Sequence, residues 1–223
     1  MTVASTEIVV RSVRAVLSPS RFATYEVAAG VKGDDDPSAL ALYAWNARVS
    51  GELLAPLHFC EVVIRNAVSD ALEAQYGHQW PWSQGFERSL PDPQVGYSPR
   101  KDLLSARRNK NATGSVIPEL AFVFWQKMFT SRYDARLWQS YLLQVLPNLN
   151  QARAIASLRQ DIYDDLDQIR RLRNRIAHHE PIFTRHLEDD FNRIIKLIEF
   201  RCPISAAWLV ANQQALAVIK AKP

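Results

Sequence analysis

Glycine is scarce in this chain: its 223 residues include 7 glycines, and the last of them is Gly114. Sheet-rich folds depend on frequent glycine-containing turns, so this scarcity favours helices joined at prolines and polar caps. Cysteine is scarcer still, because only Cys60 and Cys202 occur, far apart and each within an apolar run. This usage argues against a disulfide framework and indicates two reduced, packed thiols in a reducing compartment.

Long hydrophobic runs are also absent. No apolar stretch approaches the ~18 residues of a membrane span, and the N-terminal segment lacks the basic start and clean apolar centre of a signal peptide. We therefore expect a cytoplasmic protein that does not contact a membrane. The net charge of +4 and the pI of about 9.2 permit a polyanionic partner without requiring one.

Proline and capping residues divide the chain into helical segments. Ser18-Pro19, Asp36-Pro37 and Ser98-Pro99 each place an N-cap residue before a proline. Together with the apolar spacing, they predict helices over about 5–17, 19–29, 37–76 (bent at Pro56), 99–109, 118–130, 134–146, 150–179, 186–201 and 204–219. Residues 30–36 are expected to form a loop, and residues 77–98, with three glycines and three prolines, a long irregular one.

The segment 150–179 has the clearest helical pattern. Its apolar residues recur every three or four positions and form one stripe: Ile155, Leu158, Ile162, Leu166, Ile169, Leu172 and Ile176. A helix of about 30 residues is ~45 Å long, which suits the central element of a bundle. We expect an all-α helical bundle, built as one domain over 1–223 with a helical N-terminal arm at 1–35.

The end of that helix concentrates basic side chains. Four arginines are followed by His178, His179, Glu180 and Pro181. The residue before a proline is disfavoured in the helical region, so the two histidines should occupy the last turn. A helix C-terminus favours a cationic imidazole, whereas neighbouring arginines disfavour one. An imidazole under such opposing influences suits general acid–base chemistry near neutral pH.

The spacing within this motif limits its geometry. Asn174 and His178 are four residues apart and share a helix face, so the amide can orient the ring. At ~100° per residue, Arg173 and His178 lie about 140° apart around the helix. The two side chains reach one cleft only through the length of the arginine, an unwound helix end, or a partner subunit that completes the site.

A polar cluster also occurs earlier, in the segment 37–76. Glu61 falls on the same face as Leu57 and Ile64 and should point inward, and Arg65 is its i+4 partner, followed by Asn66. A lone carboxylate on that face is costly unless it is paired. Glu61 can therefore pair with Arg65 or instead hold an arginine of the later helix.

The stretch RNRIAHHEPIF, from Arg173 to Phe183, resembles the signature of the Abi-like (abortive infection) branch of the HEPN superfamily, an arginine followed after a few residues by a histidine. Three other stretches, LSPSRFATY, ALALYAWNARVSGELLAPLHFCEVVIRNAV and IPELAFVFWQKMF, are similar to Abi-like blocks and occur in the expected order. The resemblance covers about residues 17–201, and the ordered blocks are more specific than the Arg-x4-His spacing alone.

This resemblance implies an all-helical endoribonuclease that needs no metal or other cofactor and acts as a homodimer with one composite cleft. His178 would serve as general acid and base, Arg173 would stabilise charge on the phosphate, and Asn174 would position His178. Attack by the 2′-hydroxyl would leave a 2′,3′-cyclic phosphate, so DNA would not be cut. Relatives act in phage defence or as growth-restricting toxins, and some have an antitoxin or a noncoding RNA as partner. Toxins controlled by a nucleotidyltransferase often carry a tyrosine where this chain has Glu180, which argues against that control.

Other cationic residues are candidates for contacts with the RNA backbone: Arg170, Arg171, Arg175, His179, Arg100, Lys101, Arg107, Arg108 and Lys110. Structural roles stay open for the same residues, because the arginine run can pair with Asp161, Asp164, Asp165 and Asp167, and the segment 100–110 can be a solvated helix face. Trp80 and Trp82 either stack on bases or pin their loop to the core. Cys60 is expected to pack in the core, and no metal-ligand spacing occurs.

Two further hypotheses about function stay open. In the first, the chain is a non-catalytic helical module that binds RNA or a partner protein, and Arg173 and His178 only contact phosphate. In the second, it is a latent toxin that becomes active only after a phage trigger.

Overall fold

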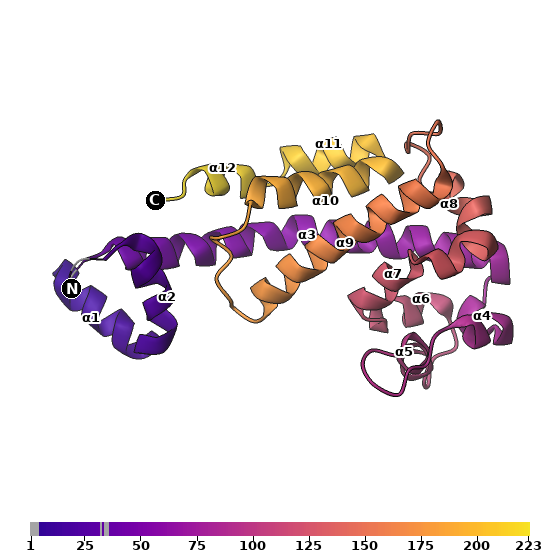
Figure 1. The fold of residues 1–223 in the computed structure, drawn as a ribbon, viewed down its shortest axis with the longest axis horizontal. Coiled ribbons are helices and arrows are strands. Elements are labelled where there is room, and N and C mark those ends of the chain that lie inside the picture. Colours follow the sequence, from indigo (N-terminus) through magenta and orange to yellow (C-terminus); the bar gives the residue numbers. More distant parts are fainter. Residues whose placement is uncertain (1–4, 32, 34–35) are drawn as a thin grey trace.

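The computed structural model describes residues 5–31, 33 and 36–223, and every regular element within these ranges is helical. The predicted all-α bundle is confirmed for this part of the chain. Helix α3 (Ser38–Tyr76) runs along the long axis of the molecule (Figure 1). It packs against α10 (Leu187–Arg201) and α12 (Ala215–Lys220), with α11 (Pro203–Ala211) beside α10, while α9 (Ile155–Ala177) crosses it on another side.

Two apolar stripes that the sequence predicts form the centre of this bundle. On α3, the side chains of Leu57, Ile64 and Val68 are buried, and the helix continues through Pro56 and ends at Tyr76, before Gly77. On α9, every member of the predicted stripe from Leu158 to Ile176 is buried, and Ile155 is half-buried. Among the described residues, no helix is long and apolar enough to cross a membrane.

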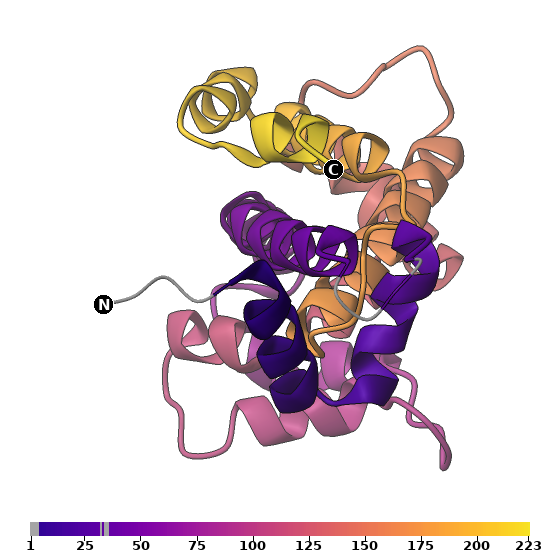
Figure 2. The same cartoon turned by 90° about the vertical axis from the view of Figure 1, so that its left-hand side faces the viewer.

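The N-terminal arm folds back onto the first turns of α3. It consists of α1 (Thr6–Leu17) and α2 (Pro19–Ala29), close to the predicted limits. Phe22 and Tyr25 of α2 are buried, and the Tyr25 ring lies 5.0 Å from that of Tyr43 on α3. The end-on view in Figure 2 shows the arm below one end of α3. Of the predicted arm and loop, residues 1–4, 32, 34 and 35 lie outside the described residues.

The long irregular loop predicted over 77–98 is wrong at two short helical segments. Residues 80–82 form a 3₁₀ turn (η1, Trp80–Trp82) and residues 84–89 form α4 (Gln84–Ser89), whereas 77–79, 83 and 90–98 are irregular as predicted. Ser83 caps α4 by accepting a hydrogen bond from the Phe86 amide. The Trp80 side chain is fully buried and donates to Ser69 Oγ at 3.1 Å, so it pins this segment to the core instead of stacking on bases.

The rest of the chain between α4 and α9 forms a lobe of short elements: α5 (Pro99–Ala106), α6 (Thr113–Val116), η2 (Ile117–Glu119), α7 (Phe122–Met128), η3 (Ser131–Tyr133), η4 (Asp134–Trp138) and α8 (Gln139–Val145). Here the predicted helix over 118–130 splits into η2 and α7, because Leu120 and Ala121 are extended. The predicted helix over 134–146 begins instead as a π-helical turn, η4, before it becomes α8.

Two other predicted helices are too long because polar side chains bond to the backbone locally. Asn150 Oδ1 accepts from the Ala152 amide, which fixes a turn and delays the start of α9 to Ile155. The predicted helix over 204–219 is interrupted where Asn212 Nδ2 donates to the Trp208 carbonyl, and the chain then restarts as α12. Both cysteines are free, as expected, but only Cys60 is fully buried, whereas Cys202 is half-buried at the start of α11.

Candidate active site at the end of α9

The backbone after α9 forms a tight cap that carries the two histidines. The helix ends at Ala177, and the His178 amide still donates to the Asn174 carbonyl at 2.9 Å. The His179 amide donates to Ile176 at 3.0 Å and the Glu180 amide to Arg175 at 2.8 Å, the bonding pattern of a Schellman motif. His179 has a φ of 55° in the position that glycine usually takes. Both imidazoles are exposed, so the cap presents them to solvent.

An ion pair with Glu61 holds Arg173 toward α3. This pair is one of the two alternatives predicted for Glu61. The Arg173 Nε lies 3.8 Å from Glu61 Oε2, while Glu61 Oε1 lies 3.7 Å from the Arg65 guanidinium. The half-buried Glu61 therefore pairs with both arginines at once. The Arg173 side chain keeps 44% of its surface exposed, so it is oriented yet available to a ligand. Asn66, the third member of the predicted cluster, is exposed on α3.

The first two arginines of the run share a single carboxylate. Asp167 accepts from Arg170 at 2.8 Å and from Arg171 at 2.7 Å, and Gln126 of α7 joins this group. Partial burial raises the pKa of Asp167, but the hydrogen bonds from Arg170 and Gln126 outweigh it and hold that pKa below its usual range. Asp167 therefore stays ionised and neutralises part of the positive charge of the run.

The other carboxylates expected to neutralise the run have different partners. Asp165 pairs with Lys196 and Arg193 of α10, and Asp161 pairs with Arg153. Arg175 instead donates to the Pro181 carbonyl at 3.0 Å and lies 3.6 Å from Glu180. The end of α9 thus keeps an excess of cationic side chains, of which Arg171 is the most exposed at 62%.

Residues distant in sequence fix the segment that follows the motif. Arg21 of α2 donates to the His179 carbonyl, and the buried Asn46 of α3 accepts from the Ile182 amide at 2.8 Å. Neither residue is among the site residues that the sequence predicts. They lie inside the stretches LSPSRFATY and ALALYAWNARVSGELLAPLHFCEVVIRNAV, but spacing alone does not reveal that they contact the motif.

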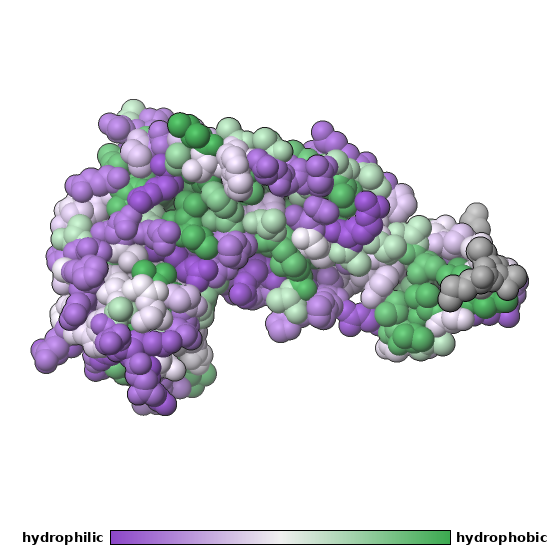
Figure 3. Space-filling model, turned by 180° about the vertical axis from the view of Figure 1, so that it is seen from behind, coloured by the Kyte–Doolittle hydropathy of each residue, from purple (hydrophilic) through white to green (hydrophobic). Residues whose placement is uncertain are grey.

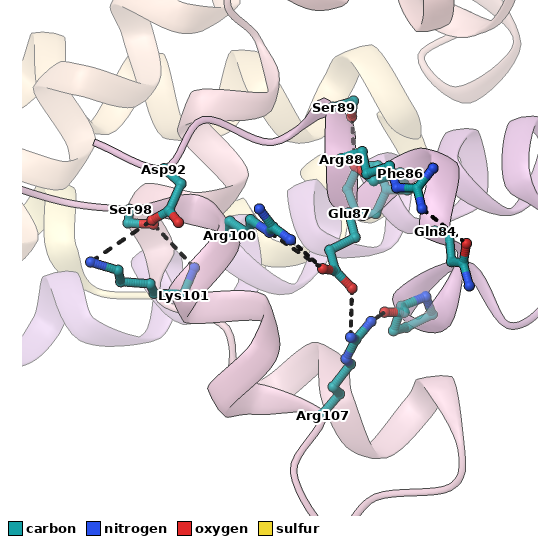
Figure 4. A network of polar contacts seen from close by, with 11 residues as sticks. Gln84, Phe86, Glu87, Arg88, Ser89, Asp92, Ser98, Arg100, Lys101 and Arg107 are labelled. Carbon is teal, nitrogen blue, oxygen red and sulfur yellow. Dashed lines mark hydrogen bonds and ion pairs between the residues drawn. The ribbon is translucent and has the colours of Figure 1, made fainter. Parts of the chain in front are cut away.

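The basic segment 100–110 lies in a separate network of ion pairs, most of which Figure 4 shows. Glu87 accepts from Arg100 at 2.8 Å and from Arg107 at 2.6 Å, and Arg107 also donates to the Pro81 carbonyl. Lys101 lies 3.9 Å from Asp92 and Lys110 lies 2.9 Å from Glu119, whereas Arg108 is exposed. Four of these five basic side chains are thus partly neutralised by carboxylates outside their segment, and contact with phosphate stays a prediction.

Glu87 should make the stability of the lobe depend on pH. Hydrogen bonds from Arg100 and then Arg107 lower its pKa, so its contribution is complete above the unfolded value of ~4.3 and is lost as the pH falls through the folded value. We expect the Tm of the wild-type chain to fall more steeply than that of Glu87→Gln between about pH 5 and pH 3. The control is Glu119→Gln, which removes an exposed carboxylate. Parallel curves for wild type and Glu87→Gln would contradict this.

Among the described residues, no three or more histidine, cysteine, aspartate or glutamate side chains gather closely enough to hold a metal ion. Burial raises the pKa of the Cys60 thiol, so Cys60 packs in the core as an un-ionised thiol, as expected from its apolar run. The side chains at the end of α9 are chiefly imidazole, amide and guanidinium groups.

Comparison of the chain with protein-family models, with curated proteins and with solved structures gives no match in any of the three.

Proposed function

We propose that this chain is a metal-independent endoribonuclease of the Abi-like HEPN type, acting in phage defence or growth control. The observation that carries the proposal is the end of α9, where an exposed His178, a half-buried Asn174 and an oriented Arg173 lie within a cationic surface. The ordered sequence blocks that resemble the Abi-like family support the same proposal. RNA is the expected partner, because guanidinium groups match phosphate oxygens.

The proposed reaction requires proton transfer and stabilisation of charge on one phosphate. The ribose 2′-oxygen attacks the adjacent phosphorus and forms a new O–P bond, while the bond from phosphorus to the 5′-oxygen breaks. One imidazole takes the 2′ proton, and another donates a proton to the leaving 5′-oxygen. Arg173 stabilises the extra negative charge on the phosphate oxygens. The products are a 2′,3′-cyclic phosphate and a 5′-hydroxyl.

A second copy of the chain would supply the second imidazole. Arg173 is directed toward α3 by Glu61, whereas His178 is the C-cap residue that follows α9. Exposed apolar side chains on the arm (Ile8, 57% exposed, and Val27, 84% exposed) offer surface that another protein molecule can cover. Figure 3 shows apolar surface on the arm and an indentation between the arm and the rest of the body. We propose that two motifs meet across a two-fold axis in such a dimer.

The test is cleavage of single-stranded RNA by the purified chain in excess EDTA. The proposal expects products with 2′,3′-cyclic phosphate ends and no cleavage of DNA of the same sequence. The non-catalytic module is favoured instead if the chain binds RNA in a salt-dependent way but never cuts it. The same must hold for chain purified from phage-infected cells, where a latent toxin would be active. Cleavage that EDTA abolishes would contradict the proposed chemistry.

Glu61→Gln should reduce cleavage modestly, by up to about five-fold, because partly exposed ion pairs contribute ~0.2–1 kcal/mol. The reason is that Glu61 orients Arg173, with the two groups 3.8 Å apart. The measurement is kcat/KM, with Glu73→Gln as the control, since Glu73 lies about three turns further along α3 and pairs with His78. In an Arg173→Lys background, Glu61→Gln should have a smaller effect than in the wild type. An equal loss in both backgrounds would show that Glu61 acts independently of Arg173.

A further inference from the structure

A pocket of about 530 Å³ lies where the arm, α3 and the end of α9 meet. Arg21, Tyr25, Tyr43, Asn46, Ser50 and His179 contribute its polar and aromatic lining, and Ile176 and Leu54 are among its apolar contacts. The proposed reaction uses none of these side chains. The pocket nevertheless adjoins the cap that carries His178, because His179 and Glu180 form part of its wall.

The aromatic wall of the pocket is held rigidly. Tyr43 is half-buried, and its ring lies 5.0 Å from Tyr25 at 68° and 6.4 Å from Phe22. Tyr25 is buried and in turn lies 5.2 Å from Phe183. The rings of Phe22 and Tyr25 therefore hold Tyr43 directly, and Phe183 holds it through Tyr25. A fixed, partly exposed tyrosine can stack on a planar base with little loss of side-chain entropy.

A buried amide supplies hydrogen-bond donors in the same pocket. Asn46 is 6% exposed, and its Oδ1 accepts from the Ile182 amide, which fixes the orientation of the side chain. No described residue accepts a hydrogen bond from its Nδ2, and this atom is not among the buried polar atoms that lack a partner. The Nδ2 donor therefore stays accessible and can bond to water or to a ligand in the pocket. The half-buried Ser50 hydroxyl is a second polar group, one turn further along α3.

Charge at the rim of the pocket favours an anion. The exposed Arg21 donates to the His179 carbonyl, which places its guanidinium next to the motif. Among the lining residues that the structure describes, Glu180 is the one carboxylate, and Arg175 lies 3.6 Å from it. A stacking ring, a free amide donor and a guanidinium together match the base, the base edge and the phosphate of one nucleotide.

We propose that this pocket binds a single unpaired nucleotide, with its base against Tyr43, its edge at Asn46 and Ser50, and its phosphate at Arg21. Its part in RNA cleavage rests on the proposed function: the pocket would hold one base next to the cut bond and so set the sequence preference. Nucleotide binding itself does not depend on cleavage. The same chemistry would fit a free mononucleotide, and the experiment separates the two sources.

The first part of the test titrates the full chain with AMP, GMP, CMP, UMP and ribose 5-phosphate, using ligand-observed NMR. At least one mononucleotide should bind more tightly than ribose 5-phosphate, and Tyr43→Leu should weaken it about five-fold or more, since stacking is worth ~1–3 kcal/mol. Asn46→Asp keeps the acceptor for Ile182 but removes the donor, so it should also weaken nucleotide binding. The control, Tyr141→Leu on α8, should change nothing. Nucleotides that bind no better than ribose 5-phosphate, or equal effects of the two tyrosine variants, would overturn the proposal.

The second part compares cleavage of RNAs that differ in one base near the cut site. The wild type should prefer one base at one position, and Tyr43→Leu should still cut but lose that preference. A preference unchanged in Tyr43→Leu would overturn the role in RNA recognition and assign the pocket to free mononucleotides. Binding of mononucleotides by a chain that never cuts RNA would support the pocket and overturn the proposed nuclease function.

Discussion

Replacement of His178 with alanine is expected to lower the rate of RNA cleavage about 10²- to 10⁴-fold, the usual contribution of a general acid or base. RNA binding should persist, because the arginines of α9 remain. The measurement is the single-turnover rate on a single-stranded RNA in EDTA, together with the affinity for the same RNA. Because His178 is exposed beyond the end of α9, the variant should stay folded, and a slower reaction would then reflect lost catalysis.

The matched control is His78→Ala. The His78 side chain is 82% exposed and pairs with Glu73, so its removal tests the loss of an exposed imidazole outside the motif. Its cleavage rate should equal that of the wild type. Equal rates for His178→Ala and the wild type would remove His178 from the mechanism, whatever the affinity for RNA.

Asp190→Ala should lower the free energy of unfolding by about 3–5 kcal/mol, because it leaves a partly buried guanidinium without its partner. Asp190 is 2% exposed and accepts two hydrogen bonds from Arg185, both at 2.8 Å. Arg185 also donates to the Gln168 carbonyl of α9. This pair therefore fastens the return from α9 to α10, directly after the motif.

Thermal and urea unfolding of Asp190→Ala and of the control Asp189→Ala measure this effect. Asp189 is exposed and also lies in the first turn of α10, so its loss should cost ~0.3–1 kcal/mol through the helix dipole alone. For a chain of this size, ~1 kcal/mol shifts the Tm by about 2–4 °C. Equal shifts for the two variants would show that the Arg185 pair adds nothing to stability.

The helices that the sequence predicts well are those with long, unbroken apolar periodicity. The stripe on α9 is buried as expected. Capping signals also serve well, because α2, bounded by Ser18-Pro19 and Gly30, has the predicted limits of 19–29. The errors arise where other interactions decide the backbone. The side chains of Asn150 and Asn212 bond to nearby backbone groups and interrupt helices, and burial of Trp80 and Phe86 orders a segment whose glycines and prolines indicate a loop.

For the candidate site, contacts within one helix could be predicted from the sequence, whereas contacts between helices could not. The short spacings within one helix placed Asn174 and His178 together and identified Glu61 as a carboxylate in need of a partner. Glu61 pairs with Arg65 on its own helix and also with Arg173 on another helix. The carboxylates that neutralise the segment 100–110 likewise come from outside that segment. Such pairs depend on how helices pack, and a single sequence carries no periodic signal for them. The nucleotide pocket was missed for that reason, since Arg21, Tyr43 and His179 come from three separate helices or their ends.

The central claim is a composite site to which two copies of the chain contribute, and a mixed dimer tests it most directly. Wild-type copies and His178→Ala copies are co-expressed with different tags, and the mixed species is purified through both tags. The proposal predicts that this heterodimer cleaves RNA far more slowly than half the wild-type rate, because one imidazole from each copy is needed to take and to donate a proton. A heterodimer that keeps half of the wild-type rate, or a wild-type chain fully active as a monomer, would contradict the claim.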